Sequence, residues 1–312
     1  MCPTLIRTHK TLSALFTNRG FDLHYIILDL EWNTAYARRI KGFINEIIEV
    51  GAVMLDDNLN TVDEFSCFIK AQVGKKLRSN VKKLTNITNE DISSGMLFTR
   101  AMSKFRDWIG SQENVILTWG DGDIRVLIEN FKYLNGINTI PFLSNYIDIQ
   151  AYVQERLGVS KAQQIGLAAA AETLGINLDD FSHHRALDDS KLTAECFRRT
   201  FDQKKLAEKI KPCNNSFYEK LAFKPYAISN INSPIVDTEL LSYKCEKCGT
   251  DGELVKDWRF SNQFFRAVYR CPVCGTSAKV AVRFKKYYDH IETKKNISII
   301  KRDDGFDNQT DE

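Results

Sequence analysis

Two acidic side chains, Asp29 and Glu31, lie near the end of an apolar segment that runs from Tyr25 to Asn33. Such a segment, bounded by polar residues, is typical of a central β-strand covered on both faces. Side chains alternate along a strand, so both carboxylates should point to the same face. Two neighbouring acids there are costly unless a cation lies between them, and a divalent metal ion is the natural partner. An ordinary solvated strand end is the alternative interpretation, because Asp-x-Glu is a common tripeptide.

The candidates for further ligands are Asp123 and Asp189, with His184 nearby in sequence. Asp123 follows an apolar strand segment (115–119) and precedes a predicted helix. Strand ends and helix N-termini are where α/β sheets place their sites. If His184 lies in a loop and Asp189 in the first turn of the next helix, both side chains can face the sheet.

Four carboxylates and one histidine have a specific chemical use. The carboxylates could hold two divalent cations roughly 3.5–4 Å apart, which would bind a scissile phosphate, activate water and stabilise the leaving oxygen. A neutral histidine would take the proton from that water. The prediction is a phosphodiester hydrolase that depends on two Mg²⁺ or Mn²⁺ ions.

The elements that must position these residues begin at residue 22. Three consecutive β-like segments with short turns, ending at residue 69, predict an antiparallel meander. Helix and strand periodicities then alternate. Helices are expected over 98–109, 124–134, 163–174 and 188–201, and strands over 115–119 and 146–149. This order predicts an α/β mixed sheet with helices on its faces.

Several motifs in this region resemble those of the DEDDh (DnaQ-like) 3′–5′ exonucleases. They are Leu28-Asp29-Leu-Glu31, Glu46-Ile-Ile-Glu-Val-Gly-Ala-Val53, Thr118-Trp-Gly-Asp-Gly-Asp123 and His184-Arg-Ala-Leu-Asp-Asp189. The third is most similar to the branch that trims small RNAs and histone mRNA ends, together with bacterial KapD-like proteins. The resemblance covers residues 22–202 and implies a ribonuclease-H-like fold.

The resemblance also implies individual roles. Asp29, Glu31 and Asp189 would bind the catalytic metal, and Asp29 with Asp123 the second metal. His184 would be the general base.

Two of these roles have an alternative residue. Asp121 could replace Asp123, although only Asp123 directly precedes the helix. His183 could replace His184, although only His184 keeps the five-residue step to Asp189. Asp188 is interpreted as a helix cap.

The chain departs from the family at one place. Members usually have threonine directly after the Asp-x-Glu pair, where it helps to hold the terminal nucleotide, and this chain has Trp32-Asn33. Trp32 could stack on a base and Asn33 could form a hydrogen bond, so both are candidate substrate-binding residues.

Two Cys-x-x-Cys-Gly motifs, separated by 22 residues, form the centre of a second module at 241–289. Their cysteines are Cys245, Cys248, Cys271 and Cys274. Four thiolates in two tight turns predict one tetrahedral, structural Zn²⁺ in a zinc ribbon, which would supply folding energy to so small a module. Four unrelated core cysteines are the alternative.

Aromatic and basic residues interleave in this module, at 258–260, 264–266 and 283–288. Cations that contact phosphates and rings that stack on bases are typical of single-stranded nucleic acid binding. The rings could equally form the small core of the ribbon, and the two arrangements could coexist on alternate strand faces. A protein partner of the ribbon is the third possibility.

The remaining segments are less informative. Residues 203–240 are interpreted as a linker, and the polar residues 290–312 as a tail. Residues 1–21 contain Arg7, Lys10 and Arg19 and no acid, which faintly resembles an organelle transit peptide. We favour an unstructured N-terminal extension. No stretch has the apolar length of a membrane span, and cysteines in metal-site spacing favour a reducing, cytoplasmic compartment.

The sequence therefore predicts a 3′–5′ exonuclease that acts on single-stranded RNA. Single-stranded DNA is the first alternative substrate. A non-catalytic regulatory binding protein on the same scaffold is the second alternative, although all five catalytic residues are present.

Overall fold

The computed structural model describes residues 23–160, 163–181 and 184–300. The chain divides into two compact units, residues 1–218 and 219–312, whose boundary falls within helix α9 (Asn215–Ala222). The predicted extension at 1–21 lies outside the described residues. No helix in the described ranges is both long and apolar enough to cross a membrane.

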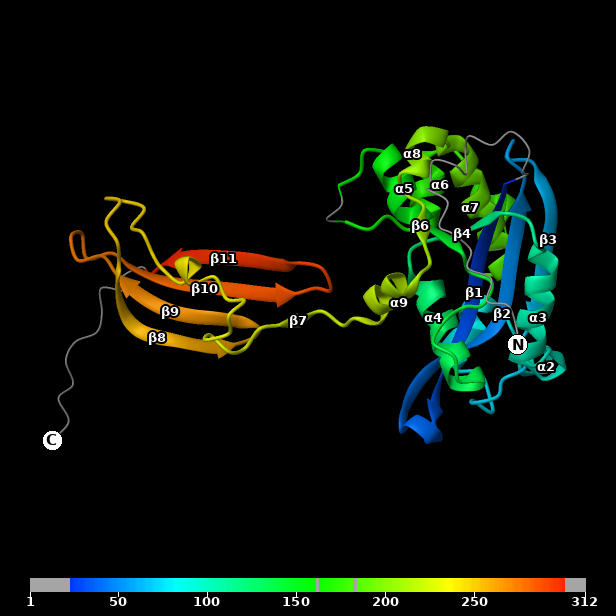
Figure 1. The fold of residues 1–312 in the computed structure, drawn as a ribbon, viewed down its shortest axis with the longest axis horizontal. Coiled ribbons are helices and arrows are strands. Elements are labelled where there is room, and N and C mark those ends of the chain that lie inside the picture. The colour runs from blue at the N-terminus through cyan, green and yellow to red at the C-terminus, as the bar shows by residue number, and fades with distance from the viewer. Residues whose placement is uncertain (1–22, 161–162, 182–183, 301–312) are drawn as a thin grey trace, which may run out of the picture. The chain divides into compact units, whose positions relative to one another are not determined.

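The first unit is built on a six-stranded mixed sheet with the order β3-β2-β1-β4-β5-β6 (Figure 1). Its strands are β1 (His24–Ala37), β2 (Gly42–Leu55), β3 (Thr61–Phe68), β4 (Asn114–Thr118), β5 (Asn145–Asp148) and β6 (Lys211–Pro212). Strands β1, β2 and β3 form the predicted antiparallel meander, β4 and β5 continue parallel to β1, and β6 is antiparallel at the edge. The ribonuclease-H-like mixed sheet is confirmed.

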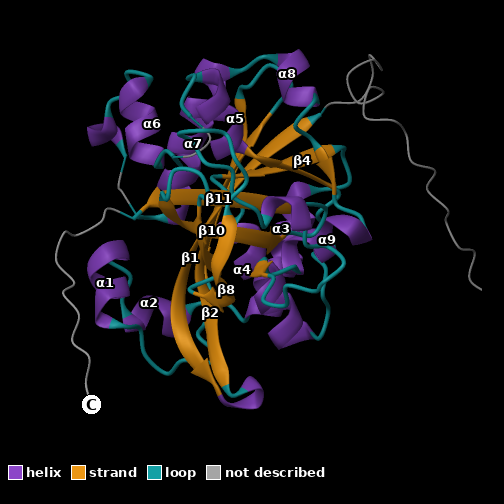
Figure 2. Ribbon diagram, turned by 90° about the vertical axis from the view of Figure 1, so that its left-hand side faces the viewer, coloured by secondary structure: helices purple, strands orange, loops and turns teal. Residues whose placement is uncertain are grey.

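Helices lie on both sides of β1 and β2 (Figure 2). The helices of this unit are α1 (Ser79–Thr85), α2 (Asn89–Ser94), α3 (Phe98–Ile109), α4 (Gly122–Asn130), α5 (Ile149–Arg156), α6 (Leu167–Thr173), α7 (Ala186–Thr200) and α8 (Gln203–Ala207). Helix α3 has the predicted bounds, α6 begins four residues later than expected, and α4 continues as a π-turn through Asn135.

The packing of β1 determines where its acids point. Tyr25 and Ile27 belong to the core that β1 shares with α5, α6 and α7, and the Tyr25 and Phe197 ring centroids are 5.3 Å apart. Because side chains alternate, Asp29 and Glu31 lie on this same face, toward α7.

The second unit is an antiparallel sheet with the order β11-β10-β9-β8. Its strands are β8 (Glu253–Ser261), β9 (Phe264–Arg270), β10 (Ser277–Lys286) and β11 (Ile291–Ile299), and the short β7 (Tyr226–Ala227) also pairs with β10. One face is buried against the chain that carries the cysteine motifs.

Two predicted segments contain more structure than the sequence indicated. The polar tail was expected from residue 290, yet β11 pairs with β10 from Ile291↔Lys286 to Ile299↔Ala278. An edge strand exposes most of its side chains and carries lysines, so its composition resembles that of a tail. Likewise, the linker at 203–240 contains α8, α9, β6, β7 and a 3₁₀ turn, Thr238–Leu240.

Candidate active site

Three of the predicted metal ligands meet at the junction of β1 and α7. Asp29, Glu31 and Asp189 each offer a carboxylate oxygen within 4.8 Å of the other two. The first two come from one strand face and the third from the first turn of α7. Residues 158 positions apart in sequence therefore form one acidic cluster, with the oxygen ligands that Mg²⁺ and Mn²⁺ prefer.

The fourth carboxylate, Asp123, is fixed to the same strand. It is buried in the first turn of α4, and its Oδ1 accepts the backbone N–H of Leu30 over 3.0 Å. The prediction that Asp123 directly precedes the helix is wrong, because α4 begins at Gly122 and its N-cap is Asp121. Leu30 lies between the two acids of β1. Asp121, the alternative, instead forms a half-exposed ion pair with Arg125 at 2.8 Å. The geometry therefore favours Asp123.

His184 lies two residues before α7, exposed, with a left-handed φ of 61°. His183 lies outside the described residues. The N-cap of α7 is Arg185, so the prediction that Asp188 caps the helix is wrong. Asp188 lies in the first turn, where its negative charge still interacts favourably with the helix dipole.

Burial and mutual repulsion make the acidic cluster hard to ionise without a cation. Burial, followed by the charges of Asp123 and Asp189, raises the pKa of Asp29 well above its usual range. Burial and Asp189 raise the pKa of Glu31 to about 8. Burial raises the pKa of Asp123 to about 7, although the Leu30 amide opposes this shift. A donor set of this kind fits divalent cations, which would favour the ionised form of each group.

These pKa shifts predict how stability depends on pH in the metal-free protein. Glu31 is protonated in the folded state up to about pH 8 but loses its proton near pH 4.5 when unfolded. The folded state thus binds more protons between these values, and the free energy of unfolding should fall as pH rises through them. Thermal melts should show this decrease, and Mn²⁺ should raise Tm more at pH 8 than at pH 6. A Glu31→Gln variant whose metal-free melts keep the full pH dependence would contradict the assignment.

An ion pair that sequence reasoning did not identify holds α7 against the sheet. Glu49 of β2 is buried, and the Nη2 of Arg185 donates to its Oε1 over 2.7 Å. The backbone N–H of Ala186 donates to the other oxygen over 3.3 Å. Glu49 pairs with Glu31 across the strands, so this contact positions the start of α7 beside the acidic cluster. The sequence signal that could have identified this contact was the motif Glu46-Ile-Ile-Glu49-Val-Gly51, which contains the glutamate.

The glycine of that motif permits the close approach of α7. A Cβ atom on Gly51 would lie 2.1 Å from both the carbonyl carbon of Ala186 and the amide nitrogen of Leu187. The Ser190 hydroxyl donates to the Gly51 carbonyl over 3.0 Å. Gly51 pairs with Asp29, so the helix packs on β2 directly beside the acid-bearing strand.

We expect Gly51→Ala to displace α7 and destabilise the first unit by about 3 kcal/mol or more, because backbone atoms cannot move aside as a side chain can. Activity should fall with the displacement of Asp189. Gly166→Ala is the matched control, because a Cβ atom there meets nothing within 4 Å. Chemical denaturation of both variants tests this, and equal stabilities would show that α7 does not approach β2 this closely.

The predicted substrate-binding pair occupies two different environments. Asn33 is buried, and its Oδ1 accepts the backbone N–H of Arg78 over 3.0 Å. Glu46, also buried, accepts the N–H groups of Gln72, Val73 and Gly74. Both side chains thus anchor the segment 72–78. Strand alternation places the half-buried Trp32 on the opposite side of β1 from Asn33.

The four cysteines of the second unit form a compact cluster. The sulfurs of Cys245 and Cys274 are 3.5 Å apart, and those of Cys248 and Cys271 are 3.4 Å apart. The hydroxyl of Thr276 lies 3.2 Å from the Cys274 sulfur, and this contact is the main reason that the pKa of that thiol is lowered to about 6. Four thiols in two matched turns are a donor set that suits one tetrahedral zinc ion.

Comparison with known proteins gives three kinds of relative. Residues 26–197 match the RNase_T family, described as exonuclease. The probable 3′–5′ exonuclease KapD of Bacillus subtilis is 30% identical over 189 residues, which are 60% of this chain and 89% of that protein. The 3′–5′ exoribonuclease 1 of Homo sapiens is 27% identical over 48% of this chain and 44% of its own length. A PolC-type DNA polymerase III of Clostridium perfringens is 26% identical over 68% of this chain, but this match spans only 14% of the polymerase.

Solved structures share the fold of the first unit. The nuclease domain of 3′hExo, a DEDDh family member bound to rAMP, is 25% identical with a TM-score of 0.50, over 58% of this chain and 92% of that one. A 3′-exonuclease that recognises the histone mRNA stem-loop is 22% identical with a TM-score of 0.52, over 62% of this chain and 86% of that one.

Proposed function

The chain belongs to the RNase_T exonuclease family of DEDDh type, and from this membership we propose that it removes nucleotides one at a time from the 3′ end of single-stranded RNA. The observation that carries the proposal is the acidic cluster of Asp29, Glu31 and Asp189, with Asp123 bonded to the same strand. A protein that used this scaffold only for binding would have no need for four clustered acids that repel one another.

Each residue of the site has a proposed role. Asp29, Glu31 and Asp189 would hold one divalent ion, and Asp29 with Asp123 would hold a second. Bound ions of this kind stabilise negative charge on the phosphate and lower the pKa of a coordinated water. His184, exposed before α7, accepts the proton of the attacking water. The water oxygen bonds to phosphorus as the 3′ oxygen leaves, which releases a nucleoside 5′-monophosphate.

Two observations support RNA as the substrate. The segment Trp119-Gly120-Asp121-Gly122-Asp123 resembles the RNA-trimming branch. The relatives also include an exoribonuclease and a nuclease domain bound to rAMP. Single-stranded DNA is the second candidate, because PolC-type DNA polymerases are among the matches.

The decisive experiment uses 5′-labelled single-stranded RNA and DNA of one sequence with Mg²⁺ or Mn²⁺. We expect a ladder that shortens from the 3′ end, faster on RNA. Asp123→Asn should remove the ladder, whereas Asp121→Asn, which alters only the exposed ion pair with Arg125, should preserve it.

Each contrary result has a definite meaning. Faster shortening of the DNA than of the RNA would show that single-stranded DNA is the substrate class. No ladder on either polymer, with metal bound, would favour the non-catalytic binding protein. If Asp121→Asn lost activity and Asp123→Asn did not, Asp121 and not Asp123 would be the fourth metal ligand.

We further propose that the cysteine cluster holds one structural zinc ion and that the protein works in the cytoplasm. The donor set supports the zinc. The thiols of Cys67, Cys196 and Cys213, which are free in the structure, suit a reducing compartment.

A further inference from the structure

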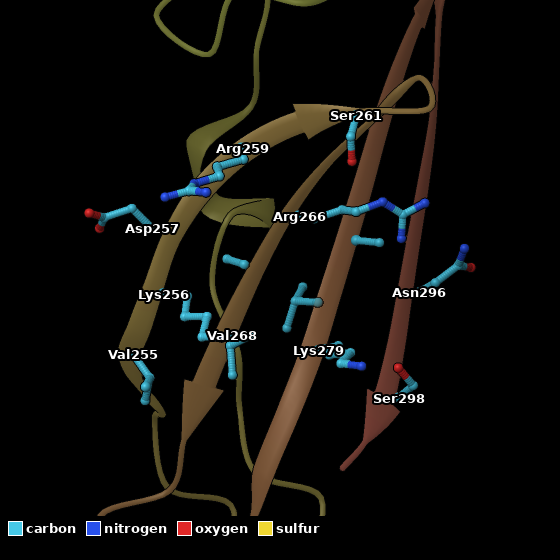
Figure 3. Close-up of a pocket in the computed structure, with 13 residues that line it drawn as sticks. Val255, Lys256, Asp257, Arg259, Ser261, Arg266, Val268, Lys279, Asn296 and Ser298 are labelled. Atoms are coloured by element: carbon cyan, nitrogen blue, oxygen red, sulfur yellow. The ribbon is translucent and has the colours of Figure 1, made fainter. Parts of the chain in front are cut away.

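The open face of the second sheet carries a concave basic surface. Its cavity has a volume of about 720 Å³, and the cations that line it are Lys256 and Arg259 of β8, Arg266 of β9 and Lys279 of β10. Asp257 is the one acid in the lining. Figure 3 shows these side chains spread over the strands, with Arg266 directed across β10 toward Asn296 of β11. We call these four cations, with the polar residues beside them, the basic face.

Strand register places the cations in two cross-strand rows. Arg259 pairs with Arg266, which pairs with Ala281, which pairs with Asn296. In the second row, Lys256 pairs with Val268, which pairs with Lys279, which pairs with Ser298. The result is a field of positive charge across β8, β9 and β10, with neutral polar donors on β11 at the edge of the sheet.

This arrangement is costly in the protein by itself. Like charges directly opposite each other on neighbouring strands, such as Arg259 and Arg266, destabilise a sheet. Among the residues that the structure describes, none of the four cations forms an ion pair with an acid. By contrast, Arg283 on the same strand as Lys279 is paired with Glu292 at 2.6 Å. An external anion would relieve the repulsion that the basic face leaves uncompensated.

Most aromatic residues of this unit do not lie on the basic face. Phe265, Tyr269 and Phe284 are buried on the opposite face of the sheet, and Trp258 packs against that core. Phe264 lies on the basic side, but the guanidinium carbons of Arg266 and Arg283 lie 5.3 and 5.5 Å from its ring centroid. The basic face therefore presents many charged donors and few free rings. Such a surface suits phosphates better than stacked bases.

We propose that the basic face binds the phosphodiester backbone of the nucleic acid substrate without regard to base sequence. This inference rests on the proposed nuclease function for the identity of the polyanion, but the residues involved are separate from the acidic cluster. Lys256, Arg259, Arg266 and Lys279 contact phosphate oxygens, and Asn296 and Ser298 donate hydrogen bonds at the edge. Affinity for long substrates is then set in this unit, and hydrolysis in the other.

The test is made in full-length protein with an Asp29→Asn background, so that the labelled oligonucleotide stays intact during binding. Arg259→Gln, Arg266→Gln and Lys279→Gln are combined in one variant. Lys224→Gln, Lys244→Gln and Lys247→Gln form the matched control, because these three exposed lysines of the same unit lie outside the basic face. Fluorescence anisotropy measures Kd for a 30-nucleotide single strand at several salt concentrations, with zinc content checked in every sample.

We expect the basic-face variant to bind at least about tenfold more weakly at 0.1 M salt than its parent. The slope of log K against log salt should decrease by about 2, the change that loss of three phosphate contacts from a single strand produces. A change of base sequence should leave Kd unaltered, and the control variant should retain nearly the affinity of its parent.

Three outcomes would overturn the inference. They are an unchanged affinity and salt slope in the basic-face variant, an equal loss in the control, and a strong dependence on base sequence. A parallel assay with an active-site-intact protein separates the two proposals. If the active protein with the basic-face substitutions shortens a short oligonucleotide, and the same substitutions in the Asp29→Asn background leave the Kd for the 30-mer unchanged, only this inference fails. If the unsubstituted protein hydrolyses nothing, the proposed function fails.

Discussion

Asp29→Asn is expected to lower the rate of 3′-end hydrolysis by at least about 10³-fold, the scale seen when a group that acts only in the transition state is removed. Asp29 is the residue common to both proposed metal positions. Its carboxylate lies within 4.8 Å of those of Glu31 and Asp189, and amide oxygen is a much weaker ligand for Mg²⁺ than carboxylate. Single-turnover cleavage of labelled RNA measures this effect.

The same substitution should leave the metal-free fold at least as stable as before. Burial and neighbouring acids raise the pKa of Asp29, so removal of its charge relieves repulsion, and asparagine keeps its shape. Asp107→Asn, at an exposed acid of α3, is the control and should retain full activity. An Asp29→Asn protein with normal cleavage would refute the site, and one with a lower Tm in the absence of metal would refute the account of repulsion.

Cys248→Ser is expected to remove the zinc and unfold the sheet of β8 to β11. Structural zinc sites contribute roughly 10–16 kcal/mol in small metal-binding domains. The Cys248 sulfur lies 3.4 Å from that of Cys271 and 4.0 Å from that of Cys274, so its loss opens the donor set. Elemental analysis should fall from one zinc per chain to nearly none, and amide hydrogens of β9 and β10 should exchange much faster.

Cys213→Ser provides the matched control. This thiol belongs to the first unit and lies outside the four-cysteine cluster, so zinc content and exchange in β9 and β10 should not change. Retention of one zinc by Cys248→Ser would show that the cluster does not need all four sulfurs. Loss of zinc without faster exchange would show that the sheet is stable on its apolar core alone.

Local pattern was sufficient for the parts of this protein that depend on short-range geometry. Strand alternation placed Asp29 and Glu31 on one face, and helical periodicity predicted α3. Motif order indicated the ribonuclease-H-like sheet, and the Cys-x-x-Cys-Gly spacing predicted four sulfurs in one cluster. For the two acids and for α3, a few neighbouring residues fix the geometry, because the backbone between them has one regular conformation.

Tertiary structure decided the contacts between distant segments. Asp121 and Asp123 have the same side chain two residues apart, and the predicted start of the helix did not distinguish them correctly, because Asp121 is the N-cap of α4. The hydrogen bond from Leu30 to Asp123 and the Asp121–Arg125 ion pair do distinguish them. The Glu49–Arg185 ion pair spans 136 positions, and the steric demand on Gly51 arises from α7, which is equally remote. Strand β11 was missed because its stabilisation comes from β10 and not from its own composition.

The second sheet shows the same division. The sequence revealed interleaved rings and cations but left three uses open for them. The pairing of the strands places Phe265 and Phe284 in the core, and Arg266 and Lys279 on the open face. Composition determines how many groups of each kind are available. Register determines which of them share a surface, because a shift of one residue would reverse every side chain.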